Sequence, residues 1–312
     1  MPYRDQIFLF GSETTSGTAA TLTGANAVPC GQFDPDVANW SQVDRTELGA
    51  RPGMLRASAI TERRVSGDIP FEFAGSGTRG TVSAIDRIML AAGFNSAAVA
   101  STSVTYGLAW PPSATTWTAR FFRDGVVYSG AGGRIPKLVI SCRSGEVLSA
   151  VASYSGLYRA PATSVNPTPT YPAPLADAVP FNSAAATPGS LTLGGVAICV
   201  EEFVLTIENT EQYYDNAGCT PRIDFTDRKV TCSLTFARPP IETLDVFTNA
   251  ASSTLAALVL PVGTVAGNIN TFNIPQLQIM PKLVNVKDSN YIQCEGMMIS
   301  SAANQELTIV QT

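Results

Sequence analysis

Two stretches of this 312-residue chain repeat one pattern at a fixed spacing. Residues 60–65 read ITERRV and are followed, after three residues, by Ile-Pro-Phe. Residues 225–230 read FTDRKV and are followed, after the same gap, by Leu-Thr-Phe. Every position in the second stretch lies 165 residues after its counterpart in the first. An echo at a fixed spacing predicts that one structural unit occurs twice in the chain.

The echo continues beyond these stretches. Each copy passes into a helix-like segment, at 83–92 and at 240–247, and then reaches an Ile-Pro pair, at 135–136 and at 274–275. The Ile-Pro pairs are 139 residues apart, so the first copy carries roughly 26 more residues between its landmarks. Insertions of this kind fall in surface loops. Alternating strands also resemble one another by chance, so the duplication rests on the shared order of the landmarks.

Local patterns in both copies favour antiparallel β-structure with one short helix. Residues 229–237 alternate strictly, with Val230 and its alternate neighbours apolar. Asp124-Gly125 between two apolar runs predicts a type I′ hairpin turn. The helix expected at 83–92 has Ser83 as a candidate N-cap and Gly93 as a candidate stop.

These patterns predict a mainly β fold, a β-sandwich or partial barrel with a flanking short helix, built as two similar domains in tandem. The expected divisions are an N-terminal arm and irregular segment at 1–56, a first domain at 57–160 and a second at 190–312. Seven prolines at 161–188 predict an extended linker at 161–189, because each proline removes a backbone donor and fixes φ.

Composition argues against most chemistry. The chain has no histidine, which removes the commonest general base and metal ligand. Its six cysteines are scattered without a CxxC pair, and Cys199, Cys232 and Cys294 fall in apolar strand patterns where buried free thiols are expected. We therefore expect no metal, no cofactor and no enzymatic activity.

Charge and hydropathy restrict the partners. Charged residues make up 14% of the chain, against about 25% in typical soluble proteins. A surface with so few charges is expected when other copies cover much of it. The net charge of −5 argues against specific nucleic-acid binding, and no apolar run reaches the roughly 18 residues of a membrane span.

The order of the landmarks resembles the tail tube proteins of long-tailed bacteriophages, a family of roughly 300-residue chains. The resemblance covers about residues 60–300, whereas the first fifty residues match nothing familiar. No single motif is specific, and the order carries the resemblance. The segments that carry it are IPFEFAGSGT at 69–78, FRDG at 122–125, GRIPKL at 133–138, SGLY at 155–158 and PTYP at 169–172.

The resemblance implies a structural subunit of the virion tail, assembled in the host cytoplasm. Such proteins form stacked rings whose strands join into an inner barrel around a lumen that conducts DNA and houses the tape measure protein. Tube terminator and distal tail proteins are further implied partners, and DNA passes without specific binding. Because family tubes are commonly sixfold, a duplicated chain predicts a ring of three with pseudo-sixfold symmetry, the alternative being a hexamer.

Eight charged residues near the echo are candidates for functional positions. Four acids are candidates for facing the lumen: Glu62, Asp68, Glu72 and Asp227. Four basic residues are candidates for salt bridges between subunits or rings, the alternatives being solvated charge or lumen charge: Arg63, Arg64, Arg228 and Lys229.

Other readings of the chain remain open. It could be another virion structural protein, such as a tube terminator, distal tail or capsid decoration protein, or a carbohydrate-binding β-sandwich adhesin. The Gly-rich loop at 75–80 lacks the phosphate-binding pattern GxxxxGK[ST]. Glu201 and Glu202 are adjacent on a predicted strand and so point to opposite faces, which excludes a converging carboxylate pair.

Overall fold

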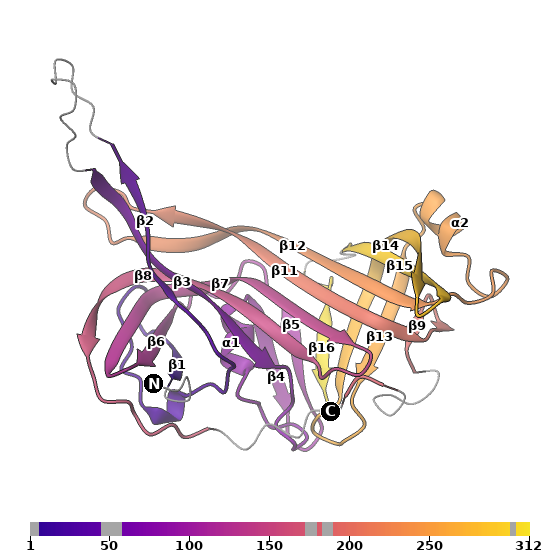
Figure 1. Ribbon diagram of the computed structural model, residues 1–312, viewed down its shortest axis with the longest axis horizontal. Coiled ribbons are helices and arrows are strands. Elements are labelled where there is room, and N and C mark those ends of the chain that lie inside the picture. The colour runs from indigo at the N-terminus through magenta and orange to yellow at the C-terminus, as the bar shows by residue number, and fades with distance from the viewer. Residues whose placement is uncertain (1–5, 45–57, 172–179, 183–189, 300–303) are drawn as a thin grey trace, which may run out of the picture.

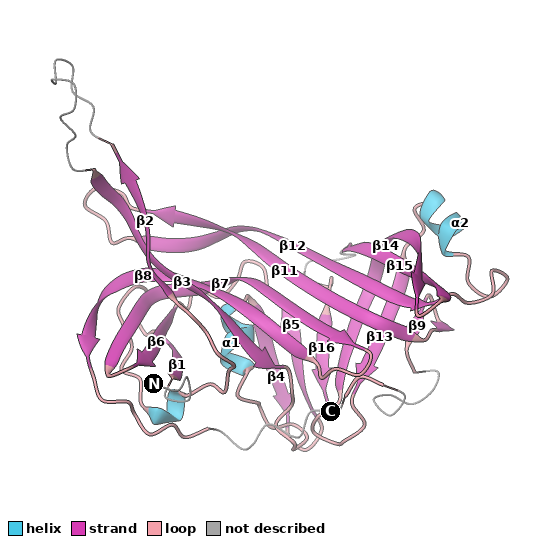
Figure 2. Ribbon diagram, viewed as in Figure 1, coloured by secondary structure: helices cyan, strands magenta, loops and turns pink. Residues whose placement is uncertain are grey.

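The computed structural model describes residues 6–44, 58–171, 180–182, 190–299 and 304–312. It is mainly β, with a long antiparallel sheet that sweeps across the molecule and does not close on itself (Figure 1). The two α-helices have six residues each and lie far apart, one under the sheet and one at its far end (Figure 2). None of the described helices is long and apolar enough to cross a membrane.

The first half of the chain carries one helix, α1 (Asp86–Ala91), and eight strands. These strands are β1 (Ile7–Ser12), β2 (Asp36–Val43), β3 (Ala59–Glu72), β4 (Phe94–Val99), β5 (Ser103–Leu108), β6 (Trp117–Arg123), β7 (Val126–Arg143) and β8 (Ser149–Thr163). A 3-10 turn at Gly24–Asn26 follows β1.

The second half has the same composition of elements. Its helix is α2 (Val246–Ala251). Its strands are β9 (Thr192–Leu193), β10 (Val196–Ala197), β11 (Val200–Tyr214), β12 (Arg222–Ala237), β13 (Ala256–Val262), β14 (Asn270–Val286), β15 (Ser289–Met298) and β16 (Thr308–Gln311).

Eight strands form what we call the main sheet, and their order repeats. The first half contributes β7-β8-β3-β2 and the second contributes β14-β15-β12-β11, in which each strand holds the place of its counterpart in chain order. The two sets are joined by the antiparallel pairing of β7 with β11, from Lys137 opposite Glu208 to Arg143 opposite Glu202. The halves therefore share one sheet.

The sequence echo coincides with a shared irregularity in this sheet. The β2–β3 register skips Thr61, and the β11–β12 register skips Thr226, which lies 165 residues later. In both places the threonine hydroxyl donates to a carbonyl on the neighbouring strand over 3.2 Å, to that of Ser41 and to that of Thr210. An unpaired extra residue of this kind is a β-bulge, which bends the strand and increases its twist.

A second layer covers the apolar face of the main sheet. In the first half this layer is β1 paired with β6, whose aromatic side chains stack against one another. Phe10 lies parallel to Trp117 with ring centroids 5.2 Å apart, and Phe8 lies 5.1 Å from Phe121. In the second half the layer is β13, β16 and the β4–β5 hairpin of the first half, which pairs with β16.

Several local expectations are confirmed. Asp124 and Gly125 have φ of 52° and 77°, as a type I′ turn requires, and they join β6 to β7. Gly93, at a φ of 91°, ends α1. All six cysteines are free, and burial raises the pKa of the Cys142 and Cys232 thiols to about 12.

Other expectations were wrong in detail. Ser83 does not cap α1, because the helix begins only at Asp86 and the N-cap Ile85 offers no side-chain acceptor. The second helix occupies 246–251 rather than 240–247, and Asp245 caps it by accepting from two backbone amides. Cys199 is exposed.

The segments before the echo and between the halves are also more ordered than their composition indicates. Within residues 1–56, β1 and β2 are regular strands, and the aromatic side chains of β1 are buried in the core. Of the proline-rich segment, the described residues bind the first half: the Thr170 amide donates to the Gly24 carbonyl and the Phe181 amide to that of Glu146. The division of the chain at 57–160, 161–189 and 190–312 stays a prediction.

The Ile-Pro landmarks do not occupy corresponding places. Ile274 lies where β14 pairs with β13, whereas Ile135 lies beyond the pairing of β7 with β6. A different repeat fits the strands better, because the tetrapeptide Pro-Lys-Leu-Val occurs at 136–139 in β7 and again at 281–284 in β14.

Candidate assembly surface on the main sheet

The main sheet has one apolar and one polar face, because alternate residues of a strand point to opposite sides. On β11 the odd-numbered Phe203, Leu205 and Ile207 are buried in the core. The even-numbered residues between them and beyond, such as Thr206 and Glu208, point away from the core. We call this side of the main sheet the polar face.

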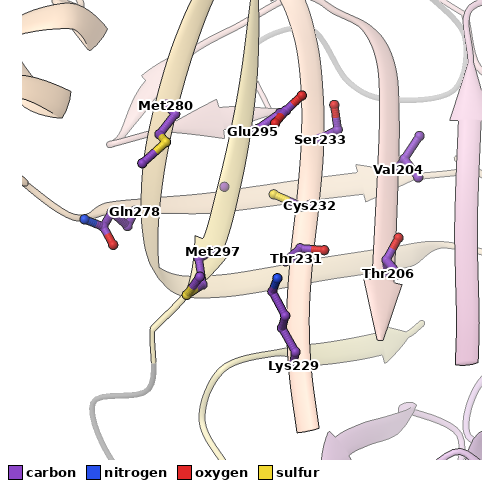
Figure 3. Close-up of a pocket in the computed structure, with 11 residues that line it drawn as sticks. Val204, Thr206, Lys229, Thr231, Cys232, Ser233, Gln278, Met280, Glu295 and Met297 are labelled. Carbon is purple, nitrogen blue, oxygen red and sulfur yellow. The ribbon is translucent and has the colours of Figure 1, made fainter. Parts of the chain in front are cut away.

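The polar face is hollowed in its second half. A shallow hollow lies across β11, β12, β15 and β14, and Figure 3 shows side chains of all four strands around it. Small polar side chains form its centre, with Lys229 and Glu295 as the charged groups and methionines on the side of β14 and β15. Its lining residues include Val204, Thr206, Lys229, Thr231, Ser233, Gln278, Met280, Glu295 and Met297.

A second hollow covers the corresponding strands of the first half. Its lining comes from β2, β3 and β8, with Glu211 of β11 reaching it from the second half. The polar residues that line it include Asp36, Asn39, Ser66, Asp68, Ser153 and Ser155. Both halves of the chain therefore present a concave surface of serine, threonine and isolated charges on the same side of the sheet.

The four candidate lumen acids all belong to strands of the main sheet. Glu62, Asp68 and Glu72 alternate with the buried Val65, Ile69 and Phe71 of β3, which places them on the polar face. Asp227 lies on β12, separated from β3 by β11, β7 and β8.

Two of these acids have partners within the polar face. Asp68 accepts a hydrogen bond from Ser153 over 2.6 Å, and Glu62 lies 3.3 Å from the guanidinium of Arg64. The structure thus places the acids on one surface without bringing them together as a cluster.

The four candidate basic residues divide into two kinds. Arg64 is held within the chain by Glu62 and by Glu211, which is 2.7 Å away. Arg228 is also held, because its side chain is only 6% exposed and contacts Glu306 at 3.2 Å. Arg63 and Lys229 are exposed, so a role between subunits falls to them more readily than to Arg64 or Arg228.

The contacts of Arg228 tie the two halves together. Its guanidinium donates to the Ala109 carbonyl over 2.9 Å and lies 5.7 Å from the centre of the Trp110 ring, both in the first half. The indole of Trp110 and the carboxylate of Glu306 enclose the cation. The sequence gave no sign of this cluster, since its members are more than a hundred residues apart.

Two strand edges of the main sheet are open. On β14, the edge opposite β15 pairs with β13 up to Leu277, and no described strand pairs with this edge from there to Val286. At the other end of the sheet, β2 pairs with β3 alone among the described strands. The sequence signal for the first edge was the second Pro-Lys-Leu-Val tetrapeptide, which our expectations overlooked.

Catalytic and metal chemistry find no support on these surfaces. Among the described residues no three His, Cys, Asp or Glu side chains come together as a metal site would need. Glu201 and Glu202 do lie on adjacent positions of β11, and Glu201 forms a 2.8 Å ion pair with Lys287 at the end of β14. The glycine-rich loop at 75–80 packs on a loop of the second half, where the Gly75 amide donates to the Asn268 side chain.

Comparison with known proteins agrees with this architecture. The family model described as "Phage tail tube protein" matches residues 4–308, nearly the whole chain. No curated protein sequence matches it. A match of this length, on a chain whose mainly β fold was expected for such a protein, shows that the chain belongs to the phage tail tube protein family.

Proposed function

We propose that three copies of this chain form a ring with six similar sheet units, and that stacked rings make the tube of a phage tail. The observation that carries the proposal is the main sheet, in which β7-β8-β3-β2 and β14-β15-β12-β11 repeat one strand order with the same bulge. Two units in one chain, with open edges at both ends, suit a closed ring in which every edge finds a partner.

In this arrangement the polar face of the main sheet lines the lumen. Its two hollows are concave, as the inner wall of a tube must be, and its serines and threonines offer no cluster of cations that would retain a phosphate backbone. Glu62, Asp68, Glu72 and Asp227 add negative charge to this face. A ring of three chains carries 3 × (−5), or −15, so the tube repels DNA and lets it slide through.

The lumen also houses the tape measure protein before DNA passes, and the ends of the tube contact the tail terminator and distal tail proteins. Arg63 and Lys229, the exposed members of the candidate basic set, supply contacts between subunits or rings. The subunits assemble in the host cytoplasm.

Microscopy of the assembled protein tests the ring. Negative-stain images should show long hollow tubes, and end-on classes at domain resolution should show three chains with two similar units alternating around the lumen. Six chains in each ring would overturn the trimer, and isolated rings or monomers under all conditions would overturn the tube.

Thiol labelling tests which face lines the lumen. A cysteine placed at Asp68 (Asp68→Cys), in a chain whose exposed Cys199 and Cys219 are serine, should react with a bulky polymer-linked maleimide in the unassembled chain and be protected in tubes. A small maleimide should reach it in both. A cysteine at the exposed Phe247 of α2, away from the polar face, serves as the control that stays reactive in both states. Equal reactivity of Asp68→Cys with the bulky reagent would exclude a luminal position.

A further inference from the structure

The pairing of β7 with β11 inside the chain shows what the open edge of β14 lacks. Along one edge, β7 pairs first with β6, up to Gly133, and then with β11, from Lys137 to Arg143. Along the corresponding edge, β14 pairs first with β13, up to Leu277, and then with no described strand. The unfilled stretch contains the second Pro-Lys-Leu-Val tetrapeptide.

Burial of the repeated leucine marks the missing strand. Leu138 of the first tetrapeptide is 0% exposed and pairs with Ile207 of β11, which is also fully buried. Leu283 of the second tetrapeptide lies on the same side of its strand as the buried Leu277 and Ile279, yet it is 56% exposed. An open edge with an exposed leucine is a site for strand addition.

The strand that corresponds to β11 in the first half is β2. Glu208 of β11 lies opposite Lys229, and Asn39 of β2 lies opposite Arg64, 165 residues before Lys229. The edge of β2 away from β3 carries no described strand, and β2 exposes Trp40 and Val43, which are 40% and 55% accessible. The open edge of β2 is therefore equivalent to the edge of β11 that binds β7.

We infer that β2 of one chain adds to β14 of a second copy of this chain as an antiparallel strand, repeating the β7–β11 junction between chains. The inference rests on the proposed ring and specifies which edges close it. Because β2 and β14 lie at opposite ends of the main sheet, one chain cannot satisfy its own edges, and the contact is head to tail.

The β7–β11 junction also indicates the register and the charges. Within the chain, Lys137 lies opposite Glu208 with its ammonium 2.9 Å from the carboxylate, on the polar face. Matching the tetrapeptides places Lys282 opposite Asn39 of the next chain, with Asp36 nearby on the same face. Counting strand by strand from the bulge places Met280 there instead, two residues earlier and also on the polar face.

Cross-linking in assembled tubes tests this contact. In a background with Cys30, Cys199 and Cys219 changed to serine, the pairs Asn39→Cys with Lys282→Cys and Asn39→Cys with Met280→Cys are treated with a short bismaleimide. The pair Lys137→Cys with Glu208→Cys is the positive control within one chain, and each single cysteine is a negative control.

We expect covalent multimers from at least one of the two Asn39 pairs, with peptides containing position 39 of one chain joined to position 282 or 280 of another. The unassembled chain should give none. Tubes that form normally but yield neither link would overturn the strand addition while leaving the tube intact. A wild-type chain that never forms rings would overturn the proposed function and this contact together.

A substitution on the exposed edge gives a second test. Leu283→Asp should leave the far-ultraviolet circular dichroism and thermal unfolding of the unassembled chain unchanged and reduce tube yield at least tenfold, because a charge would enter a buried junction. Thr254→Asp, at an exposed position after α2, is the matched control and should assemble normally. Normal tubes from Leu283→Asp would contradict the inference.

Discussion

The two halves of the chain share a main sheet and differ in the layer beneath it. Four strands and their bulge recur in the same order, whereas the first half packs β1 and β6 through stacked aromatic rings and the second packs β13 and β16 with the borrowed β4–β5 hairpin. The repeated part is the surface that presents the polar face and the open edges. The part that varies is the packing that supports it, where any well-filled core suffices.

The two copies of Pro-Lys-Leu-Val give the largest expected contrast between the halves. In the unassembled chain, Leu138→Ala should lower the free energy of unfolding by about 2–5 kcal/mol, because it leaves a cavity at a fully buried site. Leu283→Ala should change it by less than about 0.5 kcal/mol, as expected for an exposed position. Urea unfolding of both variants measures the difference.

Equal destabilisation by the two leucine variants would break this comparison, because it would mean that Leu283 is already covered in the single chain. The measurement belongs in conditions where no tubes form, since a partner strand would also bury Leu283. Repeating it on tubes sharpens the comparison, because Leu283→Ala should then weaken assembly.

A buried carboxylate distinguishes the supporting layer of the first half. Glu13, after β1, accepts four hydrogen bonds of 2.7–2.8 Å, from the hydroxyls of Thr116 and Thr118 and from the amides of Gly17 and Gly132. Glu13→Gln should cost about 3 kcal/mol, because the amide NH₂ replaces an acceptor and leaves buried donors without a partner.

Thermal unfolding of Glu13→Gln beside the exposed control Glu242→Gln checks this expectation. If the first half unfolds on its own in the Glu13 variant while β12–β15 stay protected from hydrogen exchange, the two supporting layers are independent. A single unchanged transition would instead show that Glu13 contributes little to the layer.

The sequence anticipated the repeated part better than the rest, for a physical reason. The bulge and its arginine-lysine signature are local, so 60–65 and 225–230 carried their own record. The hairpin at Asp124-Gly125 was equally local, since its turn needs positive φ at both residues. The polar face followed from strict alternation.

Features built from distant residues could not be anticipated in this way. The pairing of β5 with β16 joins residues about two hundred positions apart, and nothing in either strand names its partner. The helix at 246–251 was misplaced because Asp245, its actual cap, was included in the expected helix. The Ile-Pro match at 139 misled because a dipeptide is too short to fix a strand register.

Equivalent basic residues of the bulge should differ in their effect on stability. Arg228→Ala should cost about 2 kcal/mol, since it removes charge-assisted bonds to Ala109 and Glu306 in a nearly buried site. Its counterpart Arg63 is exposed, and Arg63→Ala should cost less than about 0.5 kcal/mol.

Chemical unfolding of the unassembled chain measures both arginine variants, with Arg228→Lys as a test of geometry. Lysine keeps the charge and loses the planar fork, so it should recover only part of the loss. A cost for Arg63→Ala as large as that for Arg228→Ala would show that the two copies use these residues alike, against the contacts described above.

The smallest effect is expected at the bulge threonines, where the two halves should agree. Thr61→Val and Thr226→Val each remove one 3.2 Å hydrogen bond to a carbonyl on the neighbouring strand while keeping the side-chain shape. Each should cost about 1 kcal/mol or less, because the threonines are exposed and water can replace part of the bond. Serine at either position retains the hydroxyl and should restore most of the stability. Since the sites lie in separate strands and share no partner, the double variant should show the sum of the single costs. A cost at one site alone would mean that the bulge stabilises only one half, and the equivalence of the two bulges would then be limited to their shape.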